Sequence, residues 1–87
     1  MKMKKKVFTI YDCKAENYLD PIMYQSRGES IRAFGDAVNQ PDHFLHKHPE
    51  DFTLFYLGEY ETNTAKYKLL DTPEALGVAI EFINHRS

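Results

Sequence analysis

The residue types that could bind a metal ion gather in one short stretch of the chain. His43, His46 and His48 form an H-x-x-H-x-H run. A metal site needs three or four ligands in a fixed geometry, and one loop could supply these three. No cysteine pair and no H-E-x-x-H helix accompanies them, and histidines in a polar loop are more often solvated or hydrogen-bonded. We therefore predict no metal site.

Nucleophilic catalysis would fall to the single cysteine, Cys13, which lies between Asp12 and Lys14. A reactive cysteine needs a stabilised thiolate and a neighbouring base, and an inert, small side chain is the simpler interpretation. A glycine-rich phosphate loop is absent, because the four glycines are scattered at Gly28, Gly35, Gly58 and Gly77. We predict that the chain is not an enzyme and uses no cofactor.

The N-terminal residues indicate a different chemistry, the binding of phosphate. A flexible basic arm over residues 1–6 would attract nucleic acid without sequence preference, and exposed aromatic rings would stack on unpaired bases. The alternative is a solubilising tail, with the tyrosines in a core or an interface. The candidate nucleic-acid-binding residues are Lys2, Lys4, Lys5, Lys6 and Arg32 for phosphate, and Tyr11 and Tyr24 for stacking.

Charge and length limit the classes of protein that fit. The 87 residues allow one domain, residues 1–87. Residues 1–40 carry seven Lys/Arg against five Asp/Glu, whereas residues 41–87 carry four against eight, so a basic nucleic-acid coat is excluded. One cysteine cannot form an internal disulfide, which indicates a cytosolic protein. No signal peptide or membrane-spanning run is evident, so we expect no membrane partner.

Local patterns predict the elements that would position these residues. Residues 7–11 and 21–25 are typical of strands, and residues 52–61 and 66–70 of a hairpin. The capping box of Ser26 and Glu29 predicts a helix over 27–39. Thr72 and Pro73 predict a second helix over 73–84. The order β-β-α-β-β-α indicates a single α+β domain, with an antiparallel sheet of about four strands and two helices on one face.

The strand over 52–61 is apolar on both faces. Phe52, Leu54 and Tyr56 share one face, and Phe55 and Leu57 share the other. Because two helices cover only one face of such a sheet, the second needs a cover: a second subunit, the 41–51 loop, or a ligand. We predict a homodimer whose interface includes Phe55 and Leu57.

Three segments carry a family resemblance: residues 6–16 (KVFTIYDCKAE), 28–34 (GESIRAF) and 48–60 (HPEDFTLFYLGEY). Together they resemble the small non-structural protein of gokushovirus-type microviruses, which are single-stranded DNA bacteriophages. The resemblance extends to the DTP segment from Asp71, and the third segment is its most specific part. It implies an early protein made in the host bacterial cytoplasm and absent from the mature virion. The family is often labelled DNA-binding by analogy with other microvirus proteins.

Two functions are therefore open. The first is an auxiliary phage protein that binds single-stranded DNA during genome replication or packaging. The second is a homodimeric adaptor that binds host or phage replication or assembly proteins, and the acidic second half of the chain favours it. Both act by binding and not by catalysis.

Overall fold

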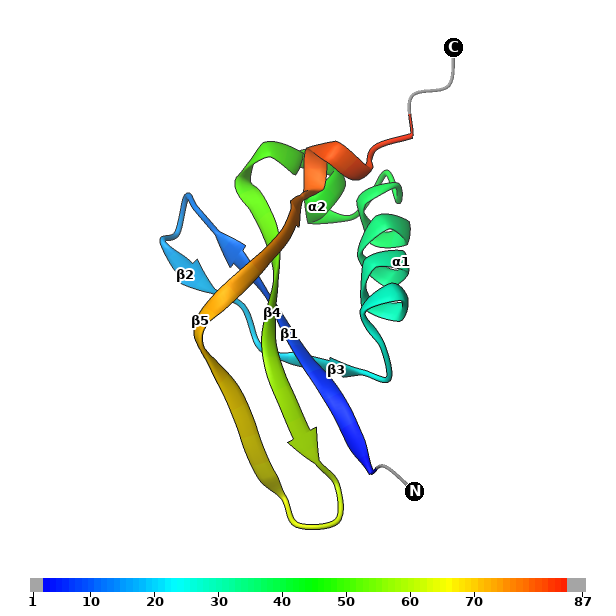
Figure 1. The fold of residues 1–87 in the computed structure, drawn as a ribbon. Helices are drawn as coiled ribbons and strands as arrows, with labels where there is room; N and C mark the ends of the chain where they lie inside the picture. Colours follow the sequence, from blue (N-terminus) through cyan, green and yellow to red (C-terminus); the bar gives the residue numbers. More distant parts are fainter. Residues whose placement is uncertain (1–2, 85–87) are drawn as a thin grey trace.

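The computed structural model describes residues 3–84, which form an antiparallel sheet with helices on one side (Figure 1). Residues rich in β-branched and aromatic side chains form the long strands, as their pattern predicts. The strands are β1 (Lys4–Asp12), β2 (Asn17–Tyr18), β3 (Ile22–Tyr24), β4 (Phe52–Glu61) and β5 (Lys66–Val78). The helices are α1 (Arg27–Val38) and α2 (Phe44–Lys47), with 3-10 turns η1 (Pro49–Asp51) and η2 (Ala79–Phe82).

The strands are arranged in the order β2-β1-β4-β5, and β3 pairs with β1 along the same edge as β2. The sheet is irregular at two places along β4, between Leu54 and Phe55 and around Leu57. Val7 and Phe8 of β1 pair with Gly58 and Tyr56, so Leu57 is an extra residue in β4. Tyr56 and Gly58 also pair with Glu74 and Leu69, which leaves residues 70–73 of β5 without β4 partners. Bulges of this kind bend strands, and β5 turns a corner here (Figure 1).

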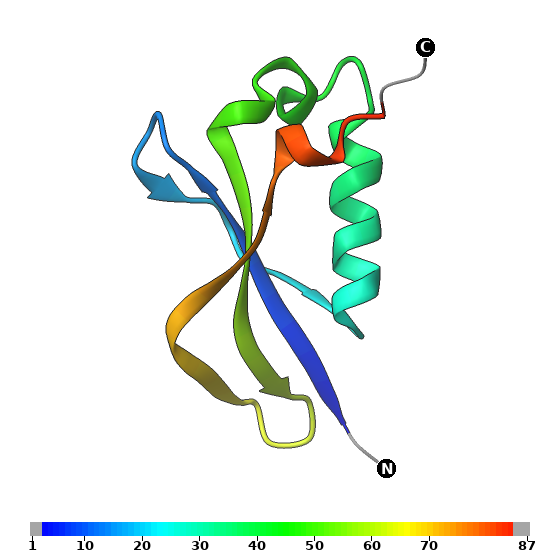
Figure 2. The same ribbon diagram turned by 45° about the horizontal axis from the view of Figure 1, so that its top comes forward.

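One core lies between the sheet and the helices. Phe8 and Ile10 of β1 pack with Leu54 and Tyr56 of β4, and the helices contribute Phe34, Val38 and Leu45. Figure 2 shows α1 alongside one side of the sheet, with α2 and η2 over its upper end. The α+β class and the antiparallel sheet with two helices on one face are therefore confirmed, although the second helix is α2 and not a helix over 73–84. Within the described residues, no helix is long and apolar enough to cross a membrane.

The cap of α1 differs in one bond from the expected capping box. The Ser26 Oγ accepts a hydrogen bond from the Glu29 amide at 3.1 Å, as predicted. The Glu29 carboxylate accepts from the Gln25 amide at 2.9 Å and not from Ser26. The helix still begins at Arg27, because Ser26 satisfies the Glu29 amide, one of the orphan amides at its start.

The helix predicted over 73–84 is wrong. β5 continues to Val78, which pairs with Thr53, and only Ala79–Phe82 form a helical turn. Pairing with the ten-residue strand β4 stabilises the extended conformation more than the local sequence favours a helix. Pro73 lies within the unpaired stretch of β5, where its missing N–H removes no ladder bond.

The segment between residues 41 and 51 was expected to be a loop that could cover the second sheet face. It instead forms α2 and η1, and Leu45 is buried in the core on the helix side. The stretch from β2 to β3 covers part of the second face: the Thr9 Oγ1 donates to the Leu19 carbonyl at 2.7 Å, and Thr9 is buried. No helix of residues 3–84 lies over the rest of that face.

Candidate nucleic-acid interface

The sheet face opposite the helices carries a cluster of three aromatic rings. Tyr11 and Tyr18 are directly paired across β1 and β2, with ring centres 4.8 Å apart. The Tyr18 ring lies edge-on to Phe55 of β4 at 5.7 Å. Tyr18 is 48% exposed. We call Tyr11, Tyr18 and Phe55 the upper aromatic cluster, and it offers ring surface to solvent.

A second aromatic group lies near the β4–β5 turn. Tyr60 and Tyr67 are cross-strand partners with ring centres 4.8 Å apart, and Tyr67 is 58% exposed. Tyr60 also pairs with Lys5 of β1. Paired residues share a face, and so do alternate residues of one strand. Lys5 and Tyr11 therefore place this lower tyrosine pair on the same face as the upper cluster, roughly 20 Å away at about 3.3 Å per residue.

Lys4, Lys5 and Lys6 are not part of an arm. They are the first residues of β1 and pair with Glu61, Tyr60 and Glu59, because β4 is long enough to extend the ladder to the hairpin end. Lys2, the fourth lysine of the predicted arm, lies outside the described residues.

Two of these lysines share one acidic partner. The Lys4 and Lys6 Nζ atoms each lie 3.7 Å from the Glu59 carboxylate, and the Lys6 Nζ also lies 5.8 Å from the centre of the Tyr56 ring. Both side chains therefore point to the helix-covered side. Lys5 forms no ion pair with any residue between 3 and 84, and it points to the uncovered face, so it is the lysine best placed to meet a phosphate beside the lower tyrosine pair.

The other two candidates lie elsewhere. Arg32 is exposed on α1, on the helix side of the sheet. Tyr24 belongs to β3, is half-buried, and packs edge-on against Phe8 with ring centres 5.9 Å apart. The structure thus brings Lys5 and Tyr11 to one face and separates Arg32 and Tyr24 from them.

An ion pair that the sequence did not indicate joins α1 to β5. The Arg27 guanidinium donates two hydrogen bonds to the Glu74 carboxylate, at 2.9 and 2.8 Å, and lies 4.6 Å from the centre of the Tyr56 ring. The hydrogen bond from Arg27 lowers the pKa of Glu74, and the same bond raises the pKa of Arg27. The charge of Arg27 is therefore paired with Glu74 within the domain.

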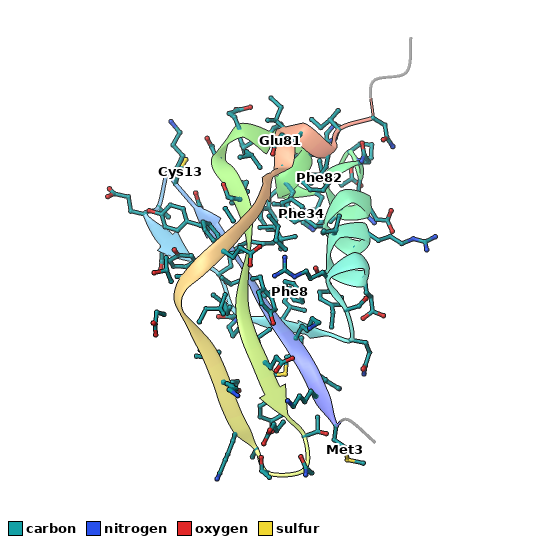
Figure 3. The ribbon with its side chains drawn as sticks, viewed as in Figure 1. Met3, Phe8, Cys13, Phe34, Glu81 and Phe82 are labelled. Atoms are coloured by element: carbon teal, nitrogen blue, oxygen red, sulfur yellow. The ribbon has the colours of Figure 1, made fainter. Side chains whose placement is uncertain are left out.

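Cys13, His43 and His46, the candidates for catalysis or metal binding, each contact other groups of the domain. The Cys13 Sγ lies 4.0 Å from the Asp51 carboxylate in an exposed turn (Figure 3). His43 caps α2 by accepting from the Leu45 amide, and the His46 Nδ1 lies 2.9 Å from the Val38 carbonyl. Among residues 3–84, no group of three or more metal-ligating side chains comes together.

The fold and this face define a small α+β protein whose open sheet face carries aromatic side chains. A family model described as Phage ORF5 protein matches residues 5–82. Protein ORF5 of Chlamydia phage 1 is 35% identical over 68 residues, which cover 74% of this chain and 71% of that protein. The chain belongs to the Phage ORF5 protein family, and its resemblance to a small protein of gokushovirus-type microviruses is confirmed. No solved structure matches the chain.

Proposed function

We propose that this phage protein binds single-stranded DNA across the uncovered sheet face, as a non-enzymatic auxiliary protein of genome replication or packaging. The observation that carries the proposal is the presence of Lys5, Tyr60 and Tyr67 beside one another on a face that no helix covers. In this proposal the protein works in the host bacterial cytoplasm and stays out of the mature virion.

Stacking supplies the main attraction. Each base that stacks on an exposed aromatic ring contributes about 1–3 kcal/mol, with little dependence on sequence. The lower tyrosine pair and the upper aromatic cluster offer such rings at two separate places on one face. A single strand can reach both, whereas the stacked bases of a duplex cannot meet either. The absence of a recognition helix on this face also favours single strands.

Fluorescence anisotropy with a labelled oligothymidylate tests the proposal at about 50 mM salt, where attraction to phosphate is strong. Tyr67→Ala should weaken binding roughly 5- to 100-fold, the equivalent of one lost stacking contact. Tyr67→Phe keeps the ring and should bind as the unmodified protein does. Absence of binding by the unmodified protein would refute the proposal, and so would equal affinity of the alanine and phenylalanine variants.

The second candidate function is a homodimeric adaptor that binds replication or assembly proteins, and it uses the same face. The observation that favours it is the half-buried pair Phe55 and Leu57, with Leu57 and Pro73 lining a shallow hollow of about 260 Å³. Sedimentation equilibrium at micromolar concentration should then give twice the monomer mass, and Phe55→Asp should give the monomer. An oligothymidylate that binds this face should lower the dimer fraction, and one that leaves it unchanged would show that the two activities do not share the face.

A further inference from the structure

A half-open cavity of about 310 Å³ lies on the helix side of the sheet, away from the proposed DNA face. Its walls come from β1, β4, α1, α2 and the β2–β3 connection. Figure 3 shows two of the wall residues, Phe8 and Phe34, between the sheet and α1. The apolar wall residues include Phe8, Ile10, Ala33, Phe34, Leu45 and Leu54. The cavity has the size and the lining of a small binding pocket.

Two hydroxyl groups of the walls are already bonded within the domain. The Thr9 Oγ1 donates to the Leu19 carbonyl and the Ser30 Oγ donates to the Arg27 carbonyl, each at 2.7 Å. The inner part of the cavity therefore offers a ligand no free hydrogen-bonding group from these two side chains. A nucleobase placed there would lose its bonds to water without gaining new ones, whereas an aromatic or branched aliphatic group would fit.

Two large apolar side chains also line the cavity and remain open to solvent. Ile22 of β3 is 45% exposed and Phe44 of α2 is 44% exposed. A small molecule within the cavity would leave much of this surface in water. A longer partner would insert one group and cover both side chains with its flanks, the arrangement in which an interface anchor is most effective.

Polar groups also lie among the lining residues. The His43 Nδ1 accepts from the Leu45 amide at 3.2 Å, so the proton of the neutral ring sits on Nε2, which can donate. Asp20 is exposed and has no hydrogen-bond or ion-pair partner among residues 3–84. One donor and one negatively charged acceptor thus lie among the lining residues, which opposes phosphate and favours a basic partner.

We propose that this cavity is a docking site for an extended peptide segment of a partner protein, with one large apolar side chain flanked by basic residues. The apolar side chain fills the cavity. Peptide groups beside it donate to Asp20 and accept from the His43 Nε2, and the basic flanks lie near Asp20. The site is distinct from the DNA face, because its apolar walls lie on the helix side of the sheet. Thr9 and Leu19 are the lining residues that it shares with the hollow on the other face.

Nuclear magnetic resonance titration of the full chain, with labelled methyl groups, tests the proposal with three capped peptides. Their central residues are Lys-Phe-Lys, Lys-Ala-Lys and Glu-Phe-Glu, between glycines. We expect shifts of the Ile22, Ala33 and Leu45 methyl groups with the first peptide. The alanine peptide should bind at least about tenfold more weakly, as expected for the loss of one buried aromatic group. The glutamate peptide should also bind several-fold more weakly.

Two variants distinguish binding of the peptide in the cavity from nonspecific binding elsewhere on the protein. Ala33→Leu fills the cavity and should abolish the shifts, while Ala15→Leu, in an exposed turn, should not. Should Ala33→Leu fail to fold, Asp20→Asn serves instead and should weaken the binding of the two lysine-flanked peptides but not that of the glutamate-flanked peptide. Equal binding of the three peptides would overturn the proposal, as would shifts centred on the methyl groups of Leu57, which lines the hollow on the other face. Binding of indole without binding of any peptide would assign the cavity to a small molecule and also overturn it.

Discussion

Arg27 and Glu74 form a two-bond ion pair between the first residue of α1 and a residue of β5 that follows the corner in that strand. The Arg27 guanidinium also lies over the Tyr56 ring of the intervening strand β4. One side chain therefore fixes the start of the helix against two strands. The pair is exposed, so its contribution is limited by solvent screening and sensitive to salt.

The pH dependence of this pair can be predicted. The folded-state pKa of Glu74 is lowered, so its stabilising effect is fully present above the unfolded-state value of about 4.3 and is lost as the pH falls through the folded-state value. Glu74→Gln should therefore lower the unfolding temperature slightly at pH 7 and have no effect at the acid end of this window. Thermal unfolding followed by circular dichroism checks this. Glu16→Gln, an exposed control, should change nothing at pH 7.

Gly58 should not tolerate a side chain. Its φ is +143°, and a Cβ there would lie 2.7 Å from the Leu69 Cα, in contact with the backbone of the neighbouring strand. Gly58→Ala should lower the free energy of unfolding by at least about 1–3 kcal/mol, the usual cost of an unfavourable backbone conformation. Chemical denaturation measures it. A Cβ at Gly28, near the start of α1, would make an ordinary contact with the Ser26 Oγ at 3.9 Å, so Gly28→Ala should be neutral or stabilise by up to about 1 kcal/mol.

The salt dependence of DNA binding should depend on Lys5 more than on its neighbours. Lys5→Gln should flatten the slope of log affinity against log salt by about 0.7, the value for one phosphate contact on a single strand. Lys4→Gln and Lys6→Gln should change the slope less, because Glu59 already pairs with both. Arg32→Gln, on the other side of the sheet, is the matched control. A larger change with Arg32→Gln than with Lys5→Gln would move the site to α1.

Asn39 should be a stability determinant although it lies outside α1. Its Nδ2 donates to the Gly35 and Phe82 carbonyls, at 2.8 and 2.9 Å, and its Oδ1 accepts from the Asn84 amide at 2.8 Å. Asn39→Ala should cost about 1–3 kcal/mol, because the half-buried carbonyls lose a donor. Amide hydrogen exchange should show faster exchange at Asn84. Asn17→Ala in the exposed strand β2 should leave that rate unchanged.

Elements with strong local signals could be predicted from the sequence. The Ser26 cap and the alternating apolar residues of 52–61 gave α1 within one residue and β4 with its observed ends. The end of β5 could not be predicted, because Thr72, Pro73 and the spacing of the apolar residues after them resemble a helix start. The pairing that decides otherwise, Val78 with Thr53, joins residues far apart in the chain.

The candidate interface was predictable only in part, for the same reason. Tyr11 could be chosen from its place in a strand, and its alternation with Ile10 puts it on the second face. Tyr60 and Tyr67 become a pair only through the register of β4 and β5. The pairing of Lys4 and Lys6 with Glu59 likewise depends on β1 lying beside β4. A sequence shows which side chains can stack or attract phosphate, but the register decides which of them share a face.

The corner in β5 has a consequence for the behaviour of the protein at high concentration. β5 is the outer strand of the sheet, and a long, straight outer strand is a template on which further chains can add and grow into fibrils. Residues 70–73 interrupt that edge, Pro73 removes a backbone donor from it, and Lys66 and Lys68 place charge along its first part. The edge is thus divided into two short pieces, neither long enough to seed an extended intermolecular sheet.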